Sequence, residues 1–189
     1  MARNDTRRTQ LADAAVRVLA AEGARGLTHR AVDAEAGVPR GTASNYFATR
    51  DAIVDAIIGR IGERLAPDPA VHAALAEREP DREAYAAYVR DILHRLLGDR
   101  DATLALFELR LEAARRPAVA EAVSAWQRGG LAGDVDFTLD AGLPGGREEI
   151  VLLHYAMDGL VLDQLTVPIA PDTDPAAAVD ALVARILRS

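Results

Sequence analysis

The segment 28–50 holds the side chains whose types and spacing best fit a chemical task, which is contact with nucleic acid. Two short helical patterns meet at Gly37-Val38, and this spacing is typical of a helix-turn-helix. After the turn come residues that offer close backbone approach or polar groups suited to base edges and phosphates: Gly41, Thr42, Ser44 and Asn45. The same pattern also fits a helical corner with a solvated face, so these residues alone leave both interpretations open.

Enzymatic chemistries have weaker support in the sequence. The chain has no Cys, which excludes disulfides, thiolate zinc sites and cysteine nucleophiles. It also lacks His-Glu-x-x-His, Gly-x-Ser-x-Gly and Gly-x-x-x-x-Gly-Lys motifs. The nearest approach to metal ligands on facing helices is Asp91-x-x-His94 together with His154 and Asp158. We predict no enzyme activity and no cofactor, and keep two alternatives: a helical-bundle metal-dependent or hydrolytic enzyme, and a protein-interaction module.

Charge divides the chain into two parts. Its 189 residues carry 22 Arg, no Lys and 29 acidic residues, a net charge of -7. Residues 1–50 hold eight Arg and five acidic residues, so they are net positive, whereas residues 51–189 carry a charge of -10. This asymmetry predicts a basic contact domain over 1–50 and an acidic body over 51–189. No apolar run approaches the length of a membrane span, and we expect a cytoplasmic protein without a membrane partner.

Hydrophobic periodicity predicts an all-α protein of about nine helices. Thr28 resembles an N-cap, Gly37 a helix stop, and Asp101 the cap of a later helix. Gly129, Gly130 and Gly133 suggest a kink in the helical pattern over 118–141. The helical segments are expected at 6–22, 28–36, after Pro39, 51–65, from Pro80 to about Leu96, 101–116, 118–141, 148–167 and 175–187, and a weaker helical segment is expected at 69–78.

Three short motifs in this region resemble the DNA-binding region of the TetR/AcrR family of transcriptional repressors. They are Gly37-Val38-Pro39-Arg40-Gly41-Thr42, Tyr46-Phe47 and Thr49-Arg50-Asp51 before an aliphatic helix. The resemblance covers about residues 7–60, and it departs from the family at Ser44, where Tyr is common, and at Arg50, where Lys is common. It implies an N-terminal three-helix DNA-binding domain and a C-terminal helical bundle that binds a small molecule and forms a homodimer.

The resemblance also implies the role of individual residues. A major-groove face would consist of Arg40, Gly41, Thr42, Ser44 and Asn45. Phosphates would be held by Thr28, Tyr46 and Arg50, with added charge from Arg7 and Arg8 ahead of the first helix. Phe47 is expected in the core, and His29 at the surface. The partner is then a double-stranded DNA operator of near-palindromic sequence.

Ligand and dimer contacts are expected in the acidic body. Aromatic walls with a few polar groups are typical of ligand cavities, which selects Tyr85, Tyr88, Phe107, Trp126, His154 and Asp158. Asp158 lies in an apolar run, where a buried carboxylate needs a partner, and His154, one turn earlier, is a candidate for that partner. The segment 148–167 is apolar nearly all round, so it needs a partner, together with the apolar residues of the last helix: Val179, Leu182, Val183 and Ile186. The function predicted is a homodimeric repressor released from its operator by a small-molecule effector.

Overall fold

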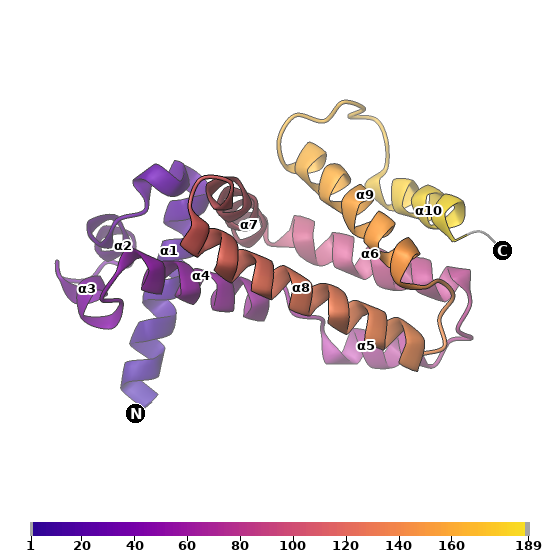
Figure 1. The fold of residues 1–189 in the computed structure, drawn as a ribbon, viewed down its shortest axis with the longest axis horizontal. Coiled ribbons are helices and arrows are strands. Elements are labelled where there is room, and N and C mark those ends of the chain that lie inside the picture. Colours follow the sequence, from indigo (N-terminus) through magenta and orange to yellow (C-terminus); the bar gives the residue numbers. More distant parts are fainter. Residues whose placement is uncertain (1, 188–189) are drawn as a thin grey trace. The chain divides into compact units, whose positions relative to one another are not determined.

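The computed structural model describes residues 2–187, and this part of the chain contains ten helices and no strand (Figure 1). The all-α prediction is confirmed. The weak segment near 70 is a helix of its own because Asp68 caps it and Pro69 opens it. The helices are α1 (Ala2–Gly26), α2 (His29–Glu35), α3 (Thr42–Tyr46), α4 (Arg50–Arg64), α5 (Pro69–Ala76), α6 (Arg82–Gly98), α7 (Arg100–Ala113), α8 (Pro117–Asp140), α9 (Arg147–Leu165) and α10 (Pro175–Ile186).

Two helix starts and one expected kink differ from the sequence prediction. The first helix begins at Ala2, so Arg7 and Arg8 lie inside α1 rather than ahead of it. Asp99, not Asp101, caps α7, because its Oδ1 accepts a hydrogen bond from the Ala102 N–H at 3.1 Å. The helix α8 runs through its three glycines as one helix, since glycine lowers helix propensity without breaking the backbone hydrogen-bond pattern.

The helices form two compact units. Unit 1 contains residues up to 65 and 99–126, and in it α1 packs against α2, α4 and α7 around a core that includes Leu11, Phe47 and Ile57. Unit 2 contains 66–98 and the residues from 127, and in it α6 packs against α9 and α10 while α5 lies on α6. The units therefore do not divide the chain at residue 50, and the functional division expected there stays a prediction.

The last helix packs mainly within unit 2. Val179 and Val183 are 0% and 1% exposed, in a helix that contacts α6 and α9. This corrects the expectation that its whole apolar face awaits a second chain. No helix among residues 2–187 has the length and apolar character needed to cross a membrane.

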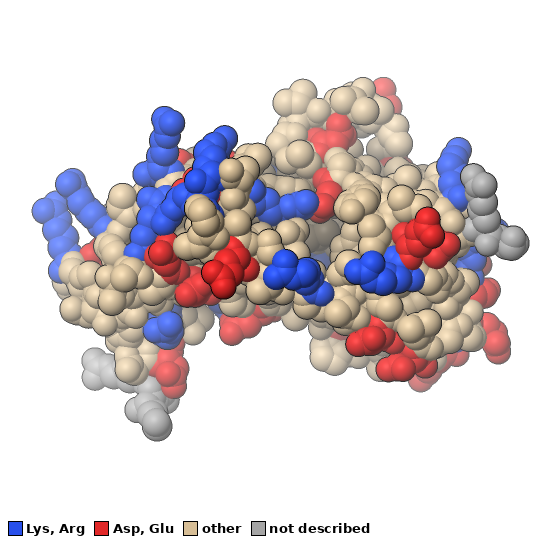
Figure 2. Space-filling model, viewed as in Figure 1, with Lys and Arg blue, Asp and Glu red and all other residues tan. Residues whose placement is uncertain are grey.

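The two units also differ in charge. Unit 1 carries 14 Arg and 13 acidic residues, whereas unit 2 carries 16 acidic residues and eight Arg, a net charge of -8. Figure 2 shows Arg side chains at the edge of unit 1 where α2 and α3 lie, and carboxylates gathered over α5 and the end of α8 in unit 2. The surface of unit 2 is thus suited to cationic partners.

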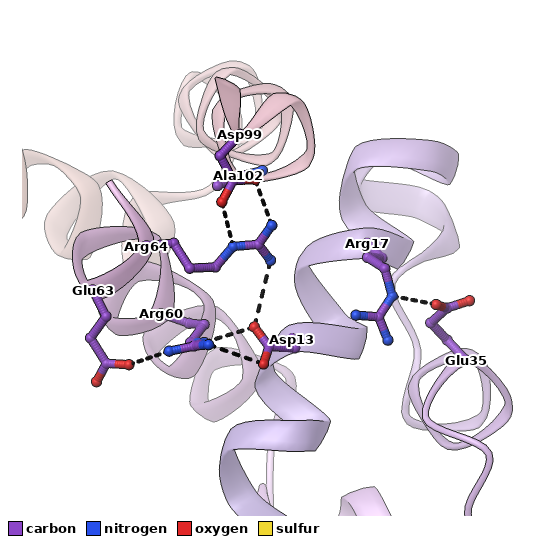
Figure 3. Close-up of polar contacts among 8 residues, drawn as sticks. All are labelled: Asp13, Arg17, Glu35, Arg60, Glu63, Arg64, Asp99 and Ala102. Atoms are coloured by element: carbon purple, nitrogen blue, oxygen red, sulfur yellow. Dashed lines mark hydrogen bonds and ion pairs between the residues drawn. The ribbon is translucent and has the colours of Figure 1, made fainter. Parts of the chain in front are cut away.

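A network of ion pairs joins three helices inside unit 1 (Figure 3). Arg60 and Arg64 both belong to α4, and both contact Asp13 of α1. Asp13 Oδ1 accepts a hydrogen bond from Arg60 Nε at 2.7 Å and lies 3.5 Å from Arg64 Nη1. Arg64 also donates to both carboxylate oxygens of Asp99, at 2.7 and 2.5 Å. Burial alone would raise the pKa of Asp99, but the hydrogen bonds from Arg64 and from the Ala102 N–H outweigh it and hold this pKa below its ordinary value.

Asp99 therefore stabilises the fold in a pH-dependent way. A carboxyl whose pKa is lowered on folding contributes fully above its unfolded pKa of about 3.9, and the contribution is lost as the pH falls through the folded value. Asp99→Asn keeps a capping oxygen but removes the charge, and we expect it to cost about 1–2 kcal/mol at pH 7. Asp99→Ala also removes the cap, at about 1 kcal/mol more. Urea unfolding at pH 7 and pH 3 checks this: wild type and the Asn variant should converge in acid, and a constant difference at both pH values contradicts it.

Candidate nucleic-acid interface

The joint between α2 and α3 is a tight turn closed by backbone hydrogen bonds. Gly37 adopts φ +64°, a conformation that favours glycine, and its N–H donates to the Ala34 carbonyl at 3.1 Å. The Val38 N–H donates to the Asp33 carbonyl at 3.0 Å. Val32 and Ala43 are fully buried and hold the two helices together. The geometry is that of a helix-turn-helix, with α3 as the second helix.

A buried carboxylate that the sequence analysis missed fixes α3. Asp33 of α2 is only 2% exposed, and its oxygens accept from the N–H groups of Gly41 at 2.7 Å and Ala43 at 2.6 Å. Gly41 stands at the N-cap of α3 and has no side chain to cap it, so Asp33 supplies the cap from the preceding helix. The available signal was an acidic residue at the helical position next to Val32, on the face turned toward the core.

The predicted base-contacting residues lie together on α3 and the turn before it. Arg40, Gly41, Ser44 and Asn45 are exposed, and Thr42 is half-buried. The Thr42 hydroxyl donates to the Pro39 carbonyl at 2.5 Å and the Ser44 hydroxyl donates to the Gly41 carbonyl at 2.9 Å, which leaves both oxygens able to accept. In the described part of the chain the side chains of Arg40 and Asn45 have no polar partner. These two side chains are available to an external ligand.

The predicted phosphate contacts differ in how they are held. Thr28 is exposed, and its hydroxyl oxygen caps α2 by accepting from the Ala31 N–H at 3.1 Å, which confirms the N-cap. Tyr46 is half-buried at the end of α3, where its carbonyl accepts from Arg8 Nη1 at 3.3 Å. The Arg8 guanidinium also lies 5.0 Å from the centre of the Phe47 ring. Arg8 is therefore packed against the end of α3.

Arg50 is turned into the protein. Its Nη2 donates to the Ala24 carbonyl of α1 and lies 3.8 Å from Glu112 Oε1 of α7, while its Nε is buried without a hydrogen-bond partner in the described part of the chain. Its phosphate contact stays a prediction, and one that competes with these internal partners.

Phe47 is fully buried, as expected for a core residue. His29, expected at the surface, is half-buried, and its Nε2 lies 2.7 Å from the Phe47 carbonyl oxygen.

The six predicted ligand residues are divided between the units. Tyr85 and Tyr88 are buried on α6 in unit 2, whereas Phe107 and Trp126 are half-buried in unit 1. Burial raises the pKa of Tyr85, a hydrogen bond to Thr138 opposes the shift, and nearby carboxylates add to it. Their role as ligand contacts stays a prediction.

His154, the candidate partner of Asp158, contacts a carboxylate on another helix. His154 is exposed on α9, and its Nε2 lies 2.9 Å from Asp134 Oδ2 of α8, while Asp158 is half-buried rather than buried. Residues one turn apart on a helix can meet, but the carboxylate that this hydrogen bond joins to His154 comes from α8. The Asp91-x-x-His94 fragment is likewise engaged, since Asp91 accepts from Arg95 at 2.8 Å. In the described part of the chain, no three His, Asp or Glu side chains are grouped so that they could hold a metal ion.

A hollow of about 700 Å³ lies within unit 2 between α6, α10 and the loop before α9. Apolar residues such as Ala86, Val183 and Leu187 line it, and the Arg90–Asp180 ion pair stands at its wall. None of the six predicted ligand residues is among its lining residues.

Comparison with known proteins identifies the class. Residues 11–57 match the model of bacterial regulatory proteins of the tetR family, and residues 80–189 match the tetracyclin repressor-like C-terminal domain. The chain belongs to the TetR family of transcriptional regulators. The resemblance in the helix-turn-helix region thus extends to the acidic body, and no curated protein matches the chain.

Several solved structures share the fold over nearly the whole chain. The multidrug binding protein EbrR in complex with imidazole is 31% identical, with a TM-score of 0.69 over 97% of this chain and 96% of that one. Similar EbrR structures contain ethidium, proflavin and malachite green. A TetR family member from Streptomyces coelicolor A3 is 31% identical, with a TM-score of 0.73 over 97% and 99% of the two chains. FadR from Bacillus subtilis, in complex with stearoyl-CoA, is 20% identical over 94% and 96%, and its TM-score of 0.71 shows the shared fold alone.

Proposed function

We propose that this regulator is a homodimeric repressor that binds a near-palindromic operator and is released by a small-molecule effector. The observation that carries the proposal is the exposed face of α3, which Asp33 holds in place through two backbone hydrogen bonds. One five-residue helix offers only a few base contacts, so specific binding needs two copies related by two-fold symmetry. Binding to an operator also requires a cytoplasmic location, which we propose with it.

The DNA-binding face consists of the residues implied by the family resemblance. Base edges would be read by Arg40, Gly41, Thr42, Ser44 and Asn45, and phosphates would be bound by Thr28, Tyr46 and Arg50. Of these, Arg40 and Asn45 are exposed and have no polar partner among the residues that the structure describes, so they carry the greatest share of base recognition in this proposal. The functional division after residue 50 assigns the remaining helices to dimerisation and effector binding.

Selection of bound duplexes from a random pool tests the proposed function directly. We expect inverted half-sites separated by about one helical turn, because the half-sites mirror the two-fold axis of the dimer. A single asymmetric consensus contradicts the proposal. A purified protein that binds no DNA at low salt would instead favour a protein-interaction module.

Two substitutions separate base contacts from phosphate contacts. Asn45→Ala should change the preferred bases, at about 1–3 kcal/mol per lost contact. Arg50→Ala should weaken binding to all sequences alike and reduce the salt slope by about 1. Arg115→Ala, which removes an exposed arginine after α7, controls for the change in charge. Binding is measured by fluorescence anisotropy over a salt series, with the unfolding midpoint of the Arg50 variant alongside because Arg50 also contacts Ala24 and Glu112. The same uniform loss from both substitutions would show that the recognition face is misplaced.

We propose an aromatic cation as the effector. Unit 2 has a net charge of -8, which favours a cationic ligand. Ethidium, proflavin and malachite green, which are aromatic cations, occupy solved structures of EbrR, and those chains are 30–31% identical to this one. The bound effector would lower the affinity for the operator by a certain factor. The bound operator would lower the affinity for the effector by the same factor.

A further inference from the structure

Three aromatic rings from three helices meet within unit 2. His72 of α5, Tyr88 of α6 and Phe137 of α8 form what we term the ring cluster. The His72 ring centre lies 5.2 Å from that of Tyr88 and 5.6 Å from that of Phe137, and the latter two are 4.9 Å apart. The contacts of Tyr88 with both other rings are edge-to-face, the arrangement in which aromatic pairs attract.

A carboxylate completes the surroundings of the His72 ring. Asp91 Oδ2 lies 3.6 Å from His72 Nε2, and the Asp91 side chain is only 11% exposed. Arg95 Nε donates to the same oxygen at 2.8 Å. Two aromatic rings and a shielded carboxylate are the surroundings that attract an aromatic cation. In this structure the ring that lies in these surroundings is the imidazole of His72, which is itself an aromatic cation when it is protonated.

The helix that carries His72 is held by few other contacts. From residue 66 to residue 83, every residue except His72 and Leu75 is exposed, and no residue of α5 is buried. Tyr88, in contrast, is 7% exposed on α6, a helix that also packs against α9 and α10. Withdrawal of α5 would therefore expose little apolar surface and leave in place α6, the helix that carries both Tyr88 and Asp91.

We propose that the aromatic cation binds against Tyr88, Phe137 and Asp91 in the place of the His72 imidazole, and that α5 moves away when it does. This inference rests on the proposed function, for which it names the effector site. Of the residues predicted from sequence as ligand contacts, Tyr88 belongs to this site, and the structure adds His72, Asp91 and Phe137. Carboxylates toward the end of α8, namely Asp134, Asp136 and Asp140, add negative charge to the same helix as Phe137.

The proposal predicts effects of opposite sign within one cluster. If His72 occupies the site, its removal should strengthen ligand binding, whereas removal of Phe137 or Asp91 should weaken it. A ring cluster that served only as packing would give no gain from any of the three substitutions. The sign of the His72 effect therefore separates the two roles.

The test uses the full chain and proflavin, followed by fluorescence titration. We expect His72→Ala to bind proflavin about threefold to tenfold more tightly, and Phe137→Ala and Asp91→Asn to bind about tenfold more weakly. Acridone, a flat and uncharged tricycle, should lose little affinity in the Asp91 variant. Val71→Ala on α5 and Leu139→Ala on α8, both exposed, are matched controls that should bind like wild type.

Each outcome decides the proposal. Unchanged or weaker binding by His72→Ala overturns it. Unchanged binding by Phe137→Ala or by Asp91→Asn does so as well, and so does the absence of proflavin binding by both wild type and His72→Ala up to the solubility limit. If Phe137→Ala does not fold by circular dichroism, Phe137→Leu keeps the bulk without the ring and should show the same loss. Operator binding of the dye-free proteins is measured in parallel, so a chain that binds proflavin but no DNA fails the proposed function and not this site.

Discussion

Replacing Asp33 by alanine is expected to abolish specific operator binding, with a loss of at least about 100-fold. The substitution leaves the N–H groups of Gly41 and Ala43 inside the joint without an acceptor, at about 1–3 kcal/mol each. A helix of five residues cannot hold its conformation by itself, so α3 should lose its fixed position against α2. Fluorescence anisotropy with the selected operator measures the loss, and circular dichroism verifies that the other helices remain.

The direction of this effect opposes simple electrostatics, which makes the test sharp. Removing a negative charge near DNA should by itself strengthen binding. Glu35→Ala is the matched control, because Glu35 lies on the same helix, is exposed and pairs at 2.5 Å with Arg17. We expect Glu35→Ala to bind at least as well as wild type. Asp33→Asn, which keeps one acceptor oxygen, should fall between the two, and an Asp33→Ala protein that behaves like Glu35→Ala contradicts the capping role.

Local signals in the sequence were sufficient for the helix-turn-helix itself. Thr28 caps the helix that directly follows it, and the turn at Gly37 depends on a φ that glycine adopts easily. Such features involve neighbours within four residues, so sequence spacing predicts them. The all-α fold follows in the same way from periodicity.

Contacts between distant residues could not be predicted in this way. Asp33 caps a helix that begins nine residues later, and Arg50 bonds to a carbonyl 26 residues earlier. His154 contacts Asp134, which lies 20 residues earlier on another helix, so sequence spacing does not predict this pair. A long polar side chain can turn toward any of several partners, and the tertiary fold determines which partner it contacts.

Dimerisation should depend on an apolar stripe that α9 leaves exposed. Leu152, Tyr155 and Leu162 are 47%, 69% and 44% exposed, and their spacing places them on one face of the helix. Gly159 lies between them, and a Cβ placed there would meet nothing within 4 Å, so a second helix can approach closely. The opposite face of α9, with Leu153, is buried in unit 2. We propose that this stripe pairs with its copy in a second chain.

The double substitution Leu152→Arg and Leu162→Arg tests the stripe without disturbing the core of unit 2. It places like charges on both sides of a two-fold interface, so we expect monomers by light scattering. Operator affinity should fall by about 100-fold or more, because a monomer binds one half-site and loses the gain from linked binding, while affinity for an isolated half-site should stay unchanged. Leu139→Arg, at an exposed leucine of α8, is the matched control and should remain dimeric.

Truncation before α10 is a less selective test, since Val179 and Val183 pack within unit 2 and their loss would damage the protomer itself. An exposed apolar stripe of this kind is typical of an interaction surface. A double variant that stays dimeric with full operator affinity would nevertheless place the dimer interface elsewhere.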